Sequence, residues 1–205
     1  MKLMLMVSAS AAAALTLLAV SNAIAADPMA SKPVDAAQDK VGAAVGKASA
    51  VSMGSHSTGA FVENAARSDM YEIEAGQIAQ QKAKSAEVKA FGKMMVTDHT
   101  SLSNQMKPLV KKAGLTPPPA LDKRRQGFID NLKSASAADF DKVYIDQQVA
   151  AHDEALSLMK GYAEHGDNAD LKAAAGKAAP KVEAHLRHAR ALGTALSGGA
   201  DGVKH

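Results

Sequence analysis

From Ser57 onward, apolar residues recur every three or four positions, which is the period of an amphipathic helix. This pattern predicts four long helices, at about residues 59–82, 85–113, 137–165 and 169–196, and a short helix at about 121–134. Gly114 ends the second helix, and the run Pro117-Pro118-Pro119 prevents it from resuming. No segment shows the strict alternation of a half-buried strand, so the pattern predicts an all-α domain.

The connections between the predicted helices indicate how they pack. Residues 83–84 and 166–168 leave room only for tight turns, so the helices that they join must run antiparallel. The longer connection at 114–136 joins the two resulting hairpins. We therefore expect an antiparallel four-helix bundle over residues 58–197, with a short extra helix in its central crossover.

Composition supports this fold class and limits the chemistry. Aromatic residues make up only 3% of the chain, and much of the 47% that is apolar is alanine, the best helix former. The net charge is +3, and short basic runs such as Lys123-Arg124-Arg125 are interpreted as solvated helix faces. Without a long basic stripe or stacking aromatics, no nucleic-acid partner is expected. Because the chain has no cysteine, any metal would be held by His, Asp or Glu.

The first 57 residues are predicted to lie outside the folded domain. Residues 1–25 combine Lys2, an apolar run to Val20 and an A-x-A site that ends at Ala25, as a cleaved secretory signal does. An uncleaved membrane helix is the rival interpretation, and no other stretch is long and apolar enough to span a bilayer. We expect a periplasmic protein, with association to the envelope left open.

Residues 26–57 contain almost no large apolar side chains and are predicted to be a flexible low-complexity linker, with at most nascent helix at 34–50. Residues 198–205 are predicted to form a disordered tail.

Several ionisable residues fall on the inward faces of the long helices, when each helix is plotted at about 100° per residue. Glu72 shares the apolar face of the first helix, while Asp98 and His99 straddle the apolar stripe of the second. His152 lies inside the face of the third helix and His185 inside that of the fourth. Counted from the turns, all lie roughly 15–25 Å along their helices, near the middle of the bundle.

Three interpretations of these inward residues remain open. They form a hydrogen-bonded polar cluster without a ligand, since buried acids and imidazoles need partners. Alternatively, they bind a metal such as iron, manganese or zinc, as carboxylates and imidazoles from facing helices do in bundles. In the third interpretation the bundle is a scaffold and function resides elsewhere. The residues proposed as metal ligands or their supporting partners are Glu72, Asp98, His99, His152 and His185.

Short motifs around these residues resemble a known family. Glu72 lies in E-I-E, Asp98-His99 forms D-H, His152 ends A-A-H, and His185 ends E-A-H. With their flanking segments, these motifs are similar to the bacterial domain of unknown function 4142 over about residues 58–196. Members are often labelled as membrane or outer-membrane proteins. The resemblance implies a ferritin-like four-helix fold and no established reaction.

The chain departs from the broader ferritin-like group, which often holds two metals with a Glu-x-x-His on each of two helices. No inward Glu-x-x-His exists here, because the second helix offers Asp98-His99 and the fourth offers Glu183 and His185, only two positions apart. One metal, or none, is therefore expected. The alternative function is a non-enzymatic envelope or stress-related protein, structural or interacting, whose buried cluster sets helix register. Whether the protein is an enzyme stays open.

Overall fold

The computed structural model describes residues 35–198, and all regular secondary structure in this part of the chain is helical. Its elements are α1 (Ala36–Ser49), the short π-helix η1 (Ala50–Gly54), α2 (Thr58–Lys82), α3 (Ala86–Lys112), α4 (Lys123–Ser134), α5 (Phe140–His165) and α6 (Ala169–Gly198). The predicted all-α class is confirmed. The bounds of all five predicted helices agree with α2 to α6 to within three residues.

Local capping explains where these helices begin and end. The Ser85 side chain accepts hydrogen bonds from the backbone N–H groups of Glu87 and Val88 at the start of α3. Asp122 caps α4 in the same way through the N–H of Arg125. Beyond the end of α3, Gly114 adopts a φ of +73°, a left-handed conformation that glycine reaches without strain.

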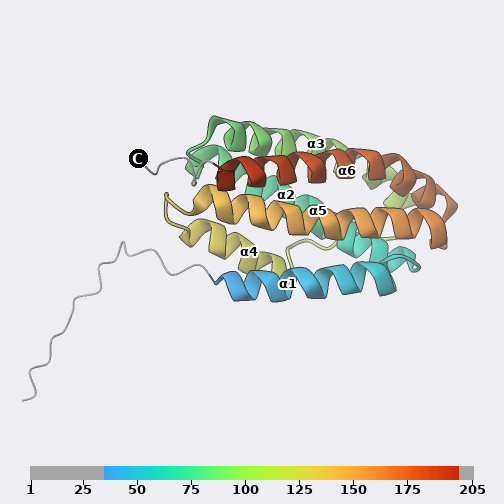
Figure 1. Ribbon diagram of the computed structural model, residues 1–205. Helices are drawn as coiled ribbons and strands as arrows, with labels where there is room; N and C mark the ends of the chain where they lie inside the picture. The colour runs from blue at the N-terminus through green and yellow to red at the C-terminus, as the bar shows by residue number, and fades with distance from the viewer. Residues whose placement is uncertain (1–34, 199–205) are drawn as a thin grey trace, which may run out of the picture. The chain divides into compact units, whose positions relative to one another are not determined.

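The four long helices pack in two close pairs, α2 with α3 and α5 with α6 (Figure 1). Further contacts join α3 to α6 and α2 to α5. The interior contains two apolar clusters at different heights, one around Phe91, Met95 and Phe140, and the other around Phe61 and Leu171. On each long helix, the residues of one cluster are separated from those of the other by buried polar residues. This polar layer is where the predicted site residues lie.

One expectation is wrong. Residues 36–54 are predicted to belong to a flexible linker, with at most nascent helix at 34–50, yet they form the helices α1 and η1. Helix α1 packs against α5 and α4, and η1 packs against α5 and α2 (Figure 1). The contact uses small residues and polar bonds instead of a large apolar stripe. Gly42 lies against the Phe128 ring, Gly46 lies over Glu154, and Asn131 donates to Asp39 over 2.7 Å. Hydrophobic periodicity cannot detect such packing.

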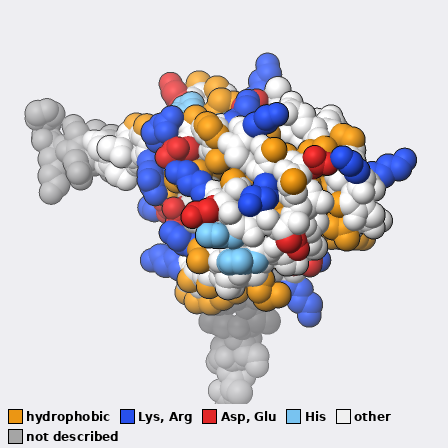
Figure 2. All heavy atoms as spheres, turned by 90° about the vertical axis from the view of Figure 1, so that its right-hand side faces the viewer, with side chains coloured by type: hydrophobic (Ala, Val, Ile, Leu, Met, Phe, Trp, Pro, Cys, Tyr) orange, Lys and Arg blue, Asp and Glu red, His pale blue; other side chains and the backbone are white. Residues whose placement is uncertain are grey.

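The remaining predictions about segments outside the bundle concern the two ends of the chain. The signal at 1–25, the rest of the linker before residue 35, and the tail at 198–205, except for Gly198 at the end of α6, lie outside the described residues. Within residues 35–198, none of the helices is long and apolar enough to cross a bilayer. On the face shown in Figure 2, basic and acidic side chains are interspersed with apolar ones, so that no single sign of charge dominates it.

Candidate metal centre

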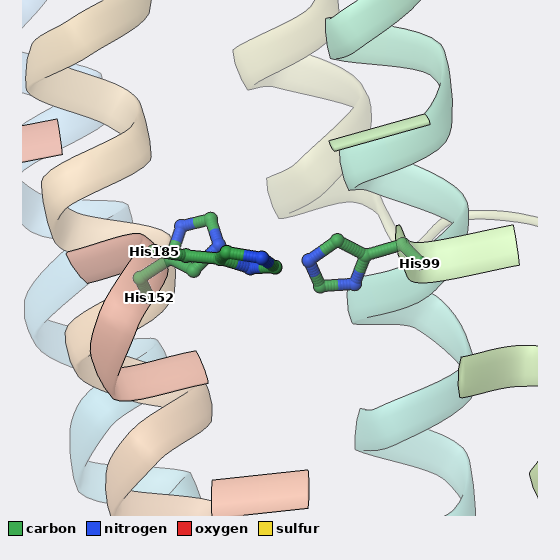
Figure 3. A group of neighbouring side chains, drawn as sticks. All are labelled: His99, His152 and His185. Atoms are coloured by element: carbon green, nitrogen blue, oxygen red, sulfur yellow. The ribbon is translucent and has the colours of Figure 1, made fainter. Parts of the chain in front are cut away.

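Three imidazoles from three different helices meet in the polar layer, and we call them the imidazole cluster: His99 on α3, His152 on α5 and His185 on α6 (Figure 3). Their exposed fractions are only 2%, 0% and 3%. One ring nitrogen of each lies within 4.8 Å of those of the other two, and the ring centroids are 5.3–5.6 Å apart. Side chains far apart in sequence therefore surround one buried point.

Each ring is held by one of its nitrogens. Carboxylate and carbonyl oxygens accept hydrogen bonds, so the ring nitrogen that faces them carries the proton. This fixes the orientation and the tautomer of each ring, as outer partners do around metal-binding histidines. The three bonds run from His99 Nδ1 to Asp69 (2.8 Å), from His152 Nδ1 to the main-chain oxygen of Gln148 (2.9 Å), and from His185 Nε2 to Asp98 (2.8 Å).

The other nitrogen of each ring has no hydrogen-bond partner among the described residues. These atoms are His99 Nε2, His152 Nε2 and His185 Nδ1, and all three are buried. In a neutral imidazole whose first nitrogen donates, the second carries a lone pair. A buried ring nitrogen without a partner is costly, and three of them in one place are unusual in a folded protein. The arrangement provides three nitrogen donors to whatever occupies the point between them.

The protonation of the rings suits this role. Burial and, to a smaller extent, the neighbouring His99 together lower the pKa of His152 to about 3, although the bond to the Gln148 carbonyl acts in the opposite direction. Burial also lowers the pKa of His185 to about 4, although its hydrogen bond to Asp98 acts in the opposite direction. For His99, burial lowers the pKa, but the bond to Asp69 and nearby carboxylates outweigh it and raise the pKa. Two rings are thus neutral near pH 7, as metal binding requires.

Of the two predicted carboxylates, only Glu72 lies in the core beside the rings. It is 1% exposed, its Oε2 accepts a hydrogen bond from Gln148 Nε2 over 2.7 Å, and its Oε1 has no partner. Glu72 Oε1 lies 3.7 Å from His152 Nδ1, outside the group of three mutually close nitrogens. Burial raises the pKa of Glu72, while His99 and Gln148 act to lower it.

Asp98 is more exposed than the other predicted site residues. Its side chain is 23% exposed and lies at the edge of the core, where it bonds to His185 and, over 3.1 Å, to Lys181. It therefore orients a ring instead of facing the central point. Asp69 holds His99 in the same way and was not among the predicted site residues, although the helical wheel places it within the apolar arc of α2.

Sequence reasoning missed a second buried polar group, which we call the arginine–glutamate cluster. Glu154 on α5 is 6% exposed and accepts two hydrogen bonds from Arg124 (2.7 and 2.8 Å) and one from Arg125 (2.7 Å). Arg125, itself 4% exposed, also donates to Asp122. The basic run at 123–125, interpreted as solvated, is thus partly buried, because α1 and α4 cover this side of α5.

Comparison with known proteins identifies one family. The family described as "Domain of unknown function (DUF4142)" matches residues 43–192, which contain both clusters and begin within α1. This is the family that the motifs around the site residues resemble. No curated protein and no solved structure matches the chain significantly.

Proposed function

The chain belongs to the DUF4142 family, and we propose that it binds one divalent transition-metal ion between His99, His152 and His185. The supporting observation is the set of three buried ring nitrogens that lack a partner and converge from three helices. A metal ion at this point would give all three nitrogens a partner at once, with His99 losing its Nε2 proton as the ion binds. A single donor molecule would satisfy only some of them.

The donor set narrows the choice of metal. Imidazole nitrogens favour zinc and iron over manganese, which prefers oxygen ligands. Three protein nitrogens leave at least one coordination position for water or another ligand. The free Oε1 of Glu72 is the carboxylate oxygen available to balance the charge of the ion. Asp69 and Asp98 would act as outer partners that hold two of the rings and raise their basicity.

The proposal extends to fold family and location. We propose a ferritin-like bundle, which is supported by the four long helices and by the resemblance of the motifs that carry the site residues. We also propose export to the periplasm, which is supported by Lys2, the apolar run to Val20 and the A-x-A site at Ala25. Mass spectrometry of the natively exported chain should find an N-terminus at Ala26. An intact chain that starts at Met1 and stays with membranes would contradict export by cleavage.

A structural role is the second candidate, and a specific observation favours it. The bonds from His99 to Asp69 and from His185 to Asp98 tie α3 to α2 and to α6. Such buried polar contacts can fix helix register without any ligand. Under this alternative the purified protein would hold no metal, and loss of one imidazole would change stability alone.

The experiment is elemental analysis of protein without an affinity tag, after separate loading with zinc, ferrous iron and manganese. We expect about one zinc or iron ion per chain. The matched variants are His185→Gln and His188→Gln, three positions apart on α6, with one histidine buried and the other exposed. His185→Gln should stay folded and lose the metal, whereas His188→Gln should retain it. No stoichiometric metal under any loading, or equal retention by both variants, would reject the metal centre.

A further inference from the structure

A pocket of about 420 Å³ lies between α3 and α6, with α2 and α5 forming its base. One end is marked by Asp69 and His99, at the level of the imidazole cluster, and the other by Leu109 and Asp170. Along α3 the pocket extends from His99 to Leu109, ten steps along the helix, which corresponds to roughly 15 Å. Its volume falls in the range of pockets that bind small molecules.

The pocket exists because small side chains from the surrounding helices do not fill the space between them. Ala65 on α2, Ala155 on α5, and Ala174 and Ala178 on α6 line it. Larger apolar side chains form the rest of the wall and are only partly exposed: Leu102, Met106, Leu109 and Met159. Methionine side chains adapt readily to the shape of an apolar ligand.

The charged residues around the pocket leave one cation unpaired among the described residues. Asp69 bonds to His99, Lys181 lies 3.1 Å from Asp98, and Lys112 lies 2.6 Å from Asp170. Lys177, on the exposed rim of α6 one turn before Lys181, has no ion-pair partner in residues 35–198. An apolar pocket with a single unpaired ammonium is complementary to an apolar chain that carries one negative charge.

We propose that this pocket binds a free aliphatic monocarboxylate of about ten carbons. The carboxylate pairs with Lys177, and the chain lies along Leu102, Met106 and Leu109. An extended chain advances about 1.2 Å per bond, so ten carbons span roughly 11 Å and fit within the roughly 15 Å of the pocket. This binding site does not depend on the proposed metal, because Lys177 carries the charge that selects the ligand.

The test is calorimetric titration of the whole chain with decanoate, decan-1-ol and decyltrimethylammonium, in chelator and again after zinc loading. Decanoate should bind with a Kd on the order of 0.1 mM in both states. The neutral alcohol should bind at least about fivefold more weakly, and the cation more weakly still.

Two pairs of variants locate the ligand. Lys177→Gln should weaken decanoate binding at least about fivefold and leave decanol unchanged, whereas Lys93→Gln, an exposed lysine elsewhere on α3, should have no effect. Ala178→Leu should fill the pocket and abolish binding of both probes, whereas Ala191→Leu, at an exposed position of α6, should not.

Equal affinity of decanoate and decanol, or no effect of Lys177→Gln, would overturn the proposal. Because Lys177 is exposed, that variant stays informative even if Ala178→Leu fails to fold. Binding of decanoate only after zinc loading would place the carboxylate on the metal and refute the role of Lys177. Binding to phosphatidylglycerol vesicles without binding of free decanoate would also overturn the proposal. It would show that the pocket contacts a membrane surface and does not bind a free aliphatic carboxylate.

Discussion

The two buried polar clusters differ in how completely their hydrogen-bonding groups are satisfied. In the arginine–glutamate cluster, both oxygens of Glu154 accept hydrogen bonds from guanidinium groups. In the imidazole cluster, three ring nitrogens and Glu72 Oε1 have no partner in the described part of the chain. Glu154 and Arg125 are buried, as are Glu72 and the three imidazoles, so both clusters must satisfy their polar groups without bulk solvent. The first cluster is complete by itself, while the second has nitrogen and oxygen atoms to which a bound ion or water would supply the missing partners.

The clusters also differ in what they join. Glu154 on α5 is paired with two residues of α4, and Arg124 additionally donates to the main-chain oxygen of Gly42 on α1 over 3.2 Å. The arginine–glutamate cluster therefore attaches the N-terminal helix to the bundle. The imidazole cluster lies between two apolar clusters that already hold the four long helices together. The first should matter for stability and the second for ligand binding.

Removing the central acid of the arginine–glutamate cluster should produce the largest effect. Glu154→Leu leaves the buried guanidinium of Arg125 and the neighbouring Arg124 without their main counter-charge. We expect the free energy of unfolding to fall by about 3–5 kcal/mol, measured by urea denaturation. Amide hydrogen exchange in α1 should accelerate, since its docking depends on Arg124.

The control for this change is Glu164→Leu, at an exposed position near the end of the same helix. It should alter stability by no more than about 0.5 kcal/mol. The metal content of the folded Glu154→Leu protein should stay that of the wild type. Loss of metal in this variant would mean that the two clusters are not separate.

The imidazole cluster should make the free energy of unfolding depend on pH. The measurement uses protein kept free of metal by a chelator. Burial lowers the pKa of His152 from 6.5 to about 3, so between these values the unfolded chain binds a proton that the folded one does not. The stability that neutral His152 contributes is complete above pH 6.5 and is lost as pH falls towards 3. At pH 4.5 the loss is roughly 2–3 kcal/mol.

Comparison with His152→Leu isolates this effect, because other groups titrate in both proteins. Burial lowers the pKa of His185 as well, which acts in the same direction, while the raised pKa of His99 acts in the opposite one. The wild type should lose stability relative to the variant between pH 7 and pH 4.5. Parallel curves would show that His152 titrates normally and that the cluster is not a dry site.

Much of the fold follows from the sequence alone, because the signals are local. Apolar periodicity, Ser85, Asp122 and Gly114 set the bounds of α2 to α6. The same periodicity identified Glu72 and the three histidines as inward-facing, since a helical wheel depends only on spacing. The register between helices could be estimated from the turns only to about one helical turn. This is too coarse to predict which side chains of different helices contact one another.

What the sequence could not show depends on contacts between distant segments. The burial of Glu154 requires α1, whose docking on Gly42 and Gly46 has no apolar periodicity to reveal it. The different roles of Asp69 and Asp98 depend on which ring each carboxylate reaches from the edge of the core. A wheel drawn for one helix at a time cannot distinguish a carboxylate that faces the centre from one that supports a neighbour.

The smallest expected effect is on metal affinity, and it follows from loss of the carboxylate of Asp69 that supports the His99 ring. Asp69→Asn keeps an oxygen that can accept from His99 Nδ1 but removes the charge that strengthens the ring as a ligand. We expect metal affinity to fall tenfold to a hundredfold, or about 1.4–2.7 kcal/mol, measured by competition with a chromophoric chelator. Asp122→Asn makes the same chemical change in the arginine–glutamate cluster and should leave the affinity unchanged. Equal affinities in both variants would mean that Asp69 only ties α2 to α3, and the contrast between the clusters would then rest on the three imidazoles alone.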